Sequence, residues 1–320
     1  MLSAAEIAAT VGTIVAAQQR DGAIPWWPDG PIDPWNLVEA AMGLDTAGAH
    51  HEAESAYRWL ADRQNDDGSF CAEYHGDTVT DAESDTNFTA YVAVGIRHHA
   101  LCTGDRGFTA TMWPMVRRAI EFALTRQEPD GQCRWRSDGR TALLAGCASI
   151  HLSLRAAGQL AADIGAPRPD WTSARGRLRD AIRTRPDLFE PKPHAMDWYY
   201  PVLTGIAAGE HLNERWQQFV VRGLGVRCVA DEPWVTGAET AELALTLACL
   251  GRRTDAVALF DCLDRLRDQD GRYWTGYQYA NRVLWPDERT TWTAGAVLLA
   301  AAALTGHLPT LDVFGSAAKV

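Results

Sequence analysis

The sequence predicts an all-α fold, an (α/α)6 toroid in which six helical hairpins close into two concentric rings of helices. Two observations predict it: helix starts recur at intervals of 42 to 61 residues, and wholly apolar helices alternate with amphipathic ones. Intervals of this size indicate one supersecondary unit repeated along the chain. The starts of the apolar helices are predicted at Asp33, Asp85, Gly146, Asp197, Glu239 and Arg289, separated by 52, 61, 51, 42 and 50 residues.

Four segments are apolar around their whole circumference, and helices of this kind are buried. We therefore predict that they belong to the inner ring. They are residues 35–44, 88–96, 243–250 and 293–304.

Four other segments carry charged residues on one side and Leu, Ile, Trp or Phe on the other, which predicts helices of the outer ring. They are residues 51–64, 111–127, 172–185 and 254–268. A first helix is predicted over residues 4–18, where Ser3 and Glu6 have the spacing of a capping box. No long segment alternates polar and apolar residues and no Asn-Gly turn occurs, so we expect no sheet beyond short hairpins in the loops.

Composition agrees with one toroid domain that spans residues 1–320. A hydrophobic fraction of 47% supports a large core, and the net charge of -11 argues against a nucleic-acid partner. The N-terminal helix lacks the basic start of a targeting peptide, and no apolar run reaches the length of a membrane span. The seven cysteines contain no C-x-x-C pair, which favours free thiols in a reducing cytoplasm. We expect a cytoplasmic protein without membrane association, metal or cofactor, and its oligomeric state is left open.

A second signature recurs in the loops that follow the outer helices. It combines Gln or Asp, an Asp-Gly pair and an aromatic residue. Its copies are QQRDGAIPWW (18–27), RQNDDGSF (63–70), RQEPDGQCRW (126–135) and RDQDGRYW (267–274). Glycine can adopt positive φ to end a helix while the aspartate caps the turn. The pattern resembles the QW repeats of squalene-cyclase-like and prenyltransferase-like toroids, and it says little about activity because a fold does not fix its function.

A ring of hairpins brings the starts of all six inner helices to one face, and carboxylates lie at five of them. The predicted mouth of the ring is therefore acidic, and we expect the chemistry there. The candidate catalytic residues are Asp33, Glu239, Asp85 and Asp197, and Glu288 is a candidate for substrate binding.

Most of these acids also have a structural explanation. Asp33, followed by a proline, and Asp85 stand where ordinary N-caps stand. Glu239 follows Thr236 at the spacing of a capping box. Asp197 has no evident capping role. Caps need not converge on one cavity, however, and a toroid forces these acids together.

Aromatic residues gather in the predicted rim loops and first helical turns. They either fill the gaps between barrel helices or stack on the C–H faces of sugar rings whose hydroxyl groups bond the carboxylates. An acidic mouth walled by Trp and Tyr suits an oligosaccharide or polysaccharide. The residues predicted to contact it are Trp26, Trp27, Trp35, Tyr74, Trp198, Tyr199, Trp234 and Trp274.

Several longer segments resemble an actinobacterial family whose members are often labelled prenyltransferase from the repeat alone. They are IDPWNLVEAAMGLD (32–45), DTNFTAYVAVGIRHHALCTGD (85–105), MDWYYPVLTG (196–205), GLGVRCVADEPWVTGAETAE (223–242) and WPDERTTWTAGAVLLA (285–300). The resemblance covers nearly the whole chain. It implies a glycoside hydrolase, because the family includes α-endomannosidases that cut intracellular methylmannose polysaccharides.

Toroid glycosidases mostly invert the anomeric centre, which requires one ionised base and one protonated acid. Asp33, at a helix N-terminus that stabilises an anion, suits the base. Glu239 suits the acid because its longer side chain follows the apolar residues 233–235, which are expected to raise its pKa. Asp85 and Asp197 are the alternatives.

Two other functions remain open at this point. A terpene cyclase of this architecture needs a D-x-D-D motif, and the nearest segment, residues 81–87 (DAESDTN), does not supply it. A prenyltransferase needs a zinc site, but the paired histidines at 50–51 and 98–99 are expected at the end of the ring opposite the mouth. A non-catalytic carbohydrate-binding toroid would need the aromatic residues without a catalytic pair of carboxylates.

Overall fold

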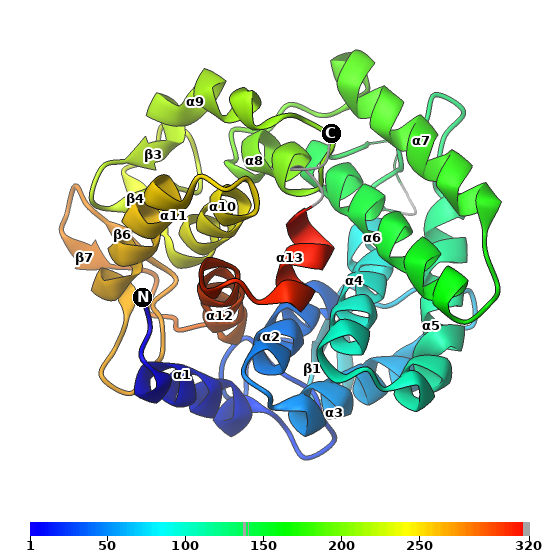
Figure 1. Ribbon diagram of the computed structural model, residues 1–320, viewed down its shortest axis with the longest axis horizontal. Coiled ribbons are helices and arrows are strands. Elements are labelled where there is room, and N and C mark those ends of the chain that lie inside the picture. Colours follow the sequence, from blue (N-terminus) through cyan, green and yellow to red (C-terminus); the bar gives the residue numbers. More distant parts are fainter. Residues whose placement is uncertain (137–138, 140, 316–320) are drawn as a thin grey trace.

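The computed structural model describes residues 1–136, 139 and 141–315, and within them two concentric rings of helices confirm the predicted (α/α)6 toroid (Figure 1). The inner helices are α2 (Pro34–Thr46), α4 (Thr86–Thr103), α6 (Leu144–Asp163), α8 (Met196–Leu203), α10 (Gly237–Cys249) and α12 (Thr291–Thr305). The outer helices are α1 (Ala4–Ala17), α3 (His50–Arg63), α5 (Arg106–Thr125), α7 (Pro169–Thr184), α9 (Leu212–Phe219) and α11 (Arg253–Phe260), the last continued by the 3-10 helix η3 (Asp261–Leu266). Two further 3-10 turns are η1 (Pro186–Leu188) and η2 (Gly209–His211).

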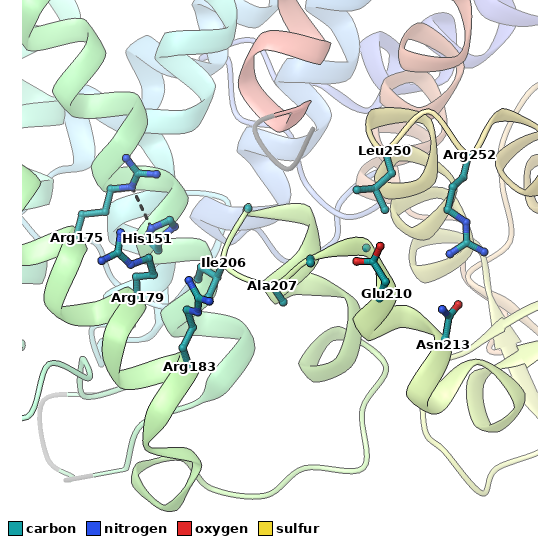
Figure 2. Close-up of a pocket in the computed structure, with 13 residues that line it drawn as sticks. His151, Arg175, Arg179, Arg183, Ile206, Ala207, Glu210, Asn213, Leu250 and Arg252 are labelled. Carbon is teal, nitrogen blue, oxygen red and sulfur yellow. Dashed lines mark hydrogen bonds between the residues drawn. The ribbon is translucent and has the colours of Figure 1, made fainter. Parts of the chain in front are cut away.

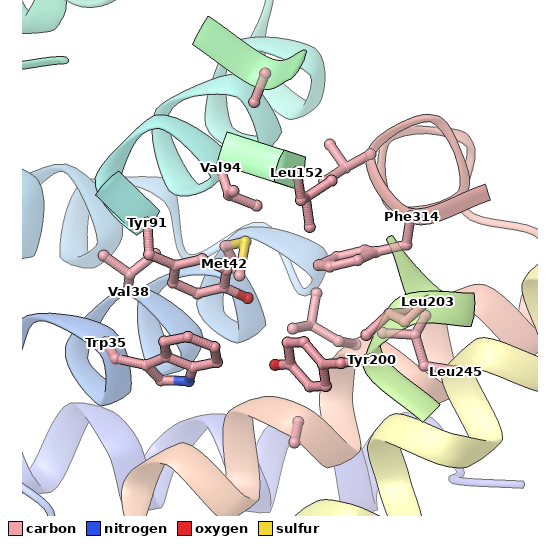
Figure 3. Close-up of a cluster of buried hydrophobic side chains, with 14 of the residues drawn as sticks. Trp35, Val38, Met42, Tyr91, Val94, Leu152, Tyr200, Leu203, Leu245 and Phe314 are labelled. Carbon is pink, nitrogen blue, oxygen red and sulfur yellow. The ribbon is translucent and has the colours of Figure 1, made fainter. Parts of the chain in front are cut away.

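One additional helix, α13 (Leu308–Phe314), lies at the centre of the ring (Figure 1). Its Phe314 joins apolar side chains from several inner helices and helps to fill the axis of the barrel (Figure 3). In the same cluster Trp35 stacks on Tyr91 with ring centroids 4.4 Å apart, and Tyr200 lies 5.8 Å from Trp35. The ring is therefore a packed core and not an open channel.

The repeated loop signature joins neighbouring hairpins. Gly22 adopts φ +102°, and a Cβ there would lie 2.2 Å from the carbonyl oxygen of Ser55 in the next outer helix. Gln18 reinforces this contact because its side-chain amide donates to the carbonyls of Gly22 and Glu52, both at 2.9 Å. Gln64 and Gln127 make the same pair of bonds in the next two copies.

The last copy of the signature closes the ring. Gly271 there packs against the backbone of Ala9 in α1, and Arg267, which replaces the glutamine, forms an ion pair with Glu6 of α1. Glu6 also completes the predicted capping box with Ser3. The repeated contact therefore runs from the last outer helix back to the first.

The expectation that sheet would be limited to short hairpins is wrong on one side of the ring. Besides the hairpin of β1 (Glu73–His75) and β2 (Thr78–Asp81), five short antiparallel strands form one sheet in the order β3-β4-β5-β6-β7. They are β3 (Val220–Val221), β4 (Gly225–Arg227), β5 (Trp234–Thr236), β6 (Gly276–Gln278) and β7 (Val283–Leu284). Strands of two or three residues are too short to show alternation, and the pairing of β5 with β6 joins the loop before α10 to the loop after η3.

Among the described residues, no single helix has the length and apolar composition of a membrane span. The helices α12 and α13 reach that length together, but they are bent by 105° at the break between them.

Candidate functional site

A cavity of about 460 Å³ opens among the N-terminal halves of the inner helices. All six of these helices or the loops directly before them contribute to it, as expected for the mouth of the ring. Its volume is within the range of small-molecule sites. Its lining includes Trp35, Asn36, Glu39, Asp85, Phe88, Trp135, Leu143, Met196, Asp197, Glu239, Glu242 and Trp292.

Three of the four predicted catalytic carboxylates line this cavity: Asp85, Asp197 and Glu239. Asp85 is the N-cap of α4. Its carboxylate accepts hydrogen bonds from the backbone of Asn87 and Phe88, at 2.8 and 3.0 Å, and from the indole of Trp135 at 2.5 Å. Burial raises its pKa despite these bonds.

Asp197 caps a neighbouring helix, a role that the sequence did not show. It lies in the first turn of α8, and its carboxylate accepts a hydrogen bond at 3.0 Å from the backbone nitrogen of Ala145 in α6. The residue that precedes α6 is Leu143, which has no side chain able to cap. Burial also raises the pKa of Asp197.

Glu239 lies in the first turn of α10, but the predicted capping box with Thr236 does not form. The hydroxyl of Thr236 donates to the carboxylate of Glu239, so it does not accept from the helix backbone. Burial and the nearby charge of Glu239 raise the pKa of the Cys228 thiol. The hydroxyl of Thr236 thus holds Glu239 in place at the cavity.

Asp33 is the N-cap of α2 and does not itself line the cavity. One carboxylate oxygen accepts from the backbone nitrogen of Asn36 at 2.9 Å. The other accepts from the side chains of Trp26 and Asn36, both at 2.6 Å. Asn36 lines the cavity and so connects Asp33 to it. Burial raises the pKa of Asp33 to about 6.

Two cavity carboxylates, Glu39 and Glu242, were missed from the sequence. Each is the sixth residue of its inner helix, α2 or α10, and so lies deeper than the first-turn acids. Glu39 accepts a hydrogen bond from the hydroxyl of Tyr91 at 3.0 Å. Glu242 accepts from the hydroxyl groups of Tyr199 and of Tyr200, the latter at 2.8 Å.

Burial raises the pKa of Glu39 to about 7 and that of Glu242 to about 8, and the nearby charge of Glu39 adds to the effect on Glu242. The sequence did contain a signal for Glu39, which is the single carboxylate of the apolar segment 35–44. A carboxylate in a helix segment that is apolar all round has to be buried, and buried carboxylates usually have partners.

Of the predicted aromatic contacts, Trp35 lines the cavity and forms part of its floor. The other predicted contact residues are outside the set that lines it. Trp198 is buried against Phe219, with ring centroids 5.2 Å apart. The hydroxyl of Tyr199 donates a hydrogen bond to the carboxylate of Glu242. The cavity instead takes Trp135 and Trp292 as further indole walls.

The remaining predicted contacts have structural partners nearer the rim. Trp26 lies edge-on to Trp27 at 5.9 Å, and Tyr74 lies edge-on to Trp59 at 5.3 Å. The indole of Trp274 donates to Asp268 at 3.0 Å, and the backbone carbonyl of Glu288 accepts from Thr275 at 3.0 Å.

Trp234 is half-buried in β5, five residues before Glu239, and packs edge-on against Trp285 at 5.2 Å. Trp285 is 51% exposed. These two indoles provide an aromatic surface on the sheet that leads into α10.

Among the residues that the structure describes, two groups of side chains could offer metal ligands, and both lie near the C-terminal ends of inner helices, away from the cavity. In the first, Asp45 accepts hydrogen bonds from His50 and His99, both at 2.9 Å. In the second, His98 lies beside Cys102 and His307, and burial lowers its pKa to about 4. In the second group His98 and His307 both share a hydrogen bond with the hydroxyl of Thr310. These bonds explain both groups as parts of the packed end of the ring.

Comparisons with known proteins place these features in context. No family model matches the chain. The chain is 48% identical over 314 residues to the MMP endo-(1,4)-3-O-methyl-alpha-D-mannosidase of Mycolicibacterium hassiacum, covering 95% of this chain and 88% of the relative. This similarity favours a glycoside hydrolase over a terpene cyclase or a non-catalytic module.

Solved structures agree on the fold. A glycosidase in complex with glucose superposes with a TM-score of 0.77 at 17% identity, over 95% of this chain and 99% of that one. A D-mannose isomerase does so with a TM-score of 0.70 at 12% identity, over 95% and 97%. Because these two neighbours differ in chemistry, the shared toroid by itself does not fix the reaction.

Proposed function

The chain belongs to the family of the MMP endo-(1,4)-3-O-methyl-alpha-D-mannosidase, and from this premise we propose that it hydrolyses internal α-(1,4) linkages of a 3-O-methylmannose polysaccharide. The observation that carries the proposal is the 48% identity over 95% of the chain. The cavity supports it independently, since several carboxylates and indoles from different helices converge there.

The lining of the cavity suits a methylated sugar. Trp35, Trp135 and Trp292 offer flat faces for the C–H surfaces of a pyranose ring, and Phe88 and Met196 are apolar surfaces on which O-methyl groups can be buried. The carboxylates beside them can accept hydrogen bonds from the free hydroxyl groups. A polysaccharide can extend further over Trp234 and Trp285, which lie on the sheet leading to Glu239.

For the reaction we propose that Glu239 is the general acid and Asp33 the general base of an inverting mechanism. Glu239 lies at the cavity and is oriented by the hydroxyl of Thr236, so its carboxyl group can be aimed at the glycosidic oxygen. Asp33 has a pKa of about 6, which keeps it ionised at neutral pH and still basic enough to activate water. Trp26 and Asn36 hold its carboxylate in place, and Asn36 lines the cavity where that water would lie.

Asp197 is the second candidate for the base, because it lines the cavity directly. The hydrogen bond described for its carboxylate is the one from the backbone nitrogen of Ala145. In that case Asp33 acts as a helix cap, and its replacement by Asn, which caps as well as Asp, leaves activity intact.

The experiment compares Asp33→Asn, Asp197→Asn and Glu239→Gln in turnover of a 3-O-methylmannose oligosaccharide. Loss of a general acid or base is expected to lower kcat by about 10²- to 10⁴-fold while substrate binding survives. Proton NMR of the first product formed by the wild type should show the β-anomer, the opposite of the α-linkage, because water attacks the face away from the leaving group. Wild-type kcat in Asp33→Asn combined with loss in Asp197→Asn would move the base to Asp197, and an α-anomeric first product would rule out inversion.

A further inference from the structure

A second cavity, of about 820 Å³, lies between α7 and the segment that follows α8, and it shares no lining residue with the mouth cavity (Figure 2). It exists because α8 is short, with eight residues where α6 has 20. The chain leaves the inner ring at Gly205, which has φ +77°, and then runs outward through η2.

Arginines dominate the wall of this cavity. Arg175, Arg179 and Arg183 are spaced four residues apart along α7 and therefore lie on one face of that helix. Arg252, which follows α10, lies across the hollow from them (Figure 2). Glu210 is the acidic residue that also lines the cavity. This excess of positive charge occurs in a protein with a net charge of -11.

The positive charge is only partly neutralised by protein groups. Arg179 pairs with Asp180 and Arg252 pairs with Asp255, each at 2.8 Å. Arg183 has no ion-pair partner within 4.0 Å among residues 1–136, 139 and 141–315. Like charges four residues apart destabilise a helix, so this row of arginines is unfavourable in the absence of an anion.

A buried histidine holds one of these arginines in place without cancelling its charge. The guanidinium of Arg175 donates to Nε2 of His151 at 3.0 Å. Burial and the positive charges of Arg175, Arg155 and Arg179 lower the pKa of His151 to about 3, so the imidazole is neutral. A neutral acceptor fixes the direction of Arg175 and leaves its charge available to a ligand.

We propose that this cavity binds a small organic molecule that carries two adjacent phosphate groups. Guanidinium groups bind phosphate in bidentate fashion, and the arginine row on α7 extends over about 12 Å, which is longer than one phosphate requires. Ile206, Ala207 and Leu250 form an apolar wall beside the arginines for the organic part of the ligand. The volume is that of a site for a mononucleotide-sized molecule.

The test is isothermal titration calorimetry of the intact protein at low salt, with inorganic pyrophosphate and with ADP as probes. Arg183→Gln and Arg179→Gln should each weaken binding at least tenfold. Arg177→Gln is the matched control: it removes the same charge from the same helix, but Arg177 donates to Gln127 and does not line the cavity. This control should bind within about twofold of the wild type.

The probes distinguish the part of the ligand that is recognised. Tighter binding of ADP than of pyrophosphate would show that the apolar wall contributes and supports the proposal. Equal binding would overturn the proposal's organic part, because the phosphates alone would then be recognised. Absence of binding of both probes at millimolar concentration would overturn the whole proposal, as would equal weakening by Arg177→Gln. The measurement does not use glycosidase activity, so its outcome is independent of the proposed function.

Discussion

The buried pair Glu39 and Glu242 makes the stability of this protein depend on pH in a way that one substitution should reveal. Both side chains lie at the floor of the mouth cavity and are hydrogen-bonded by tyrosine hydroxyl groups. Burial raises both pKa values, to about 7 for Glu39 and about 8 for Glu242. The folded state therefore retains protons that the unfolded chain releases at much lower pH.

The sign of the effect follows from proton linkage. A carboxyl group whose pKa is raised on folding stabilises the protein fully below its unfolded pKa of 4.5, and this stabilisation is lost as pH rises through the folded value. Each unit of pKa shift corresponds to about 1.4 kcal/mol. Through this coupled pair the wild type should lose unfolding free energy on the order of a few kcal/mol between pH 5 and pH 8.

Glu242→Gln replaces the carboxyl with a neutral group of similar shape and removes that loss. Urea unfolding at pH 5, 6.5 and 8, followed by circular dichroism, measures the difference between variant and wild type. The variant should gain stability relative to the wild type as pH rises. Glu232→Gln, at an exposed position, removes the same charge and should show no such trend. A pH-independent difference for Glu242→Gln would refute the linkage argument.

Two further predictions concern the loops and the aromatic residues. Gly22→Ala should destabilise the fold by more than about 1 kcal/mol, because Gly22 has a positive φ and a Cβ there would lie 2.2 Å from the carbonyl oxygen of Ser55. The control Gly12→Ala, in a helix with open space around it, should stabilise the fold by about 0.5 to 1 kcal/mol. Thermal melts compare the two variants, and equal effects would contradict the role of the loop in joining neighbouring hairpins. Trp198→Ala should lower the free energy of unfolding by about 3 to 5 kcal/mol, because Trp198 is buried. Trp285→Ala should weaken polysaccharide binding in calorimetry without changing the melting temperature, because Trp285 is exposed. A lower melting temperature with unchanged binding in Trp285→Ala would rule out Trp285 as a surface for the sugar.

Much of the fold could be predicted from the sequence because its signals are local. A helix apolar on every side, such as residues 293–304, has to be buried, and α12 is the inner helix found there. The loop signature likewise showed where outer helices end. The five-stranded sheet could not be foreseen, because the pairing of Trp234 with Gln278 joins two loops that are distant in sequence and each too short to show a pattern.

The site was predicted only in outline, for a physical reason. The sequence placed Asp85, Asp197 and Glu239 at helix starts, and the ring brings these three to one cavity. It could not show that the carboxylate of Asp197 bonds the start of α6, or that Trp198 points away toward Phe219, since both depend on packing between helices. Cavity walls are set by these side-chain directions, and helix periodicity alone does not determine them.

Hydrolysis of a methylated mannose polymer at the mouth cavity can be measured on the polymer itself. The purified protein is incubated with methylmannose polysaccharide, and the products are analysed by mass spectrometry beside a Glu239→Gln control. Internal cleavage predicts shorter methylated oligosaccharides that each gain one water, formed by the wild type and strongly reduced in the variant. A polysaccharide of unchanged mass after prolonged incubation with folded wild-type protein would rule out its hydrolysis by this protein.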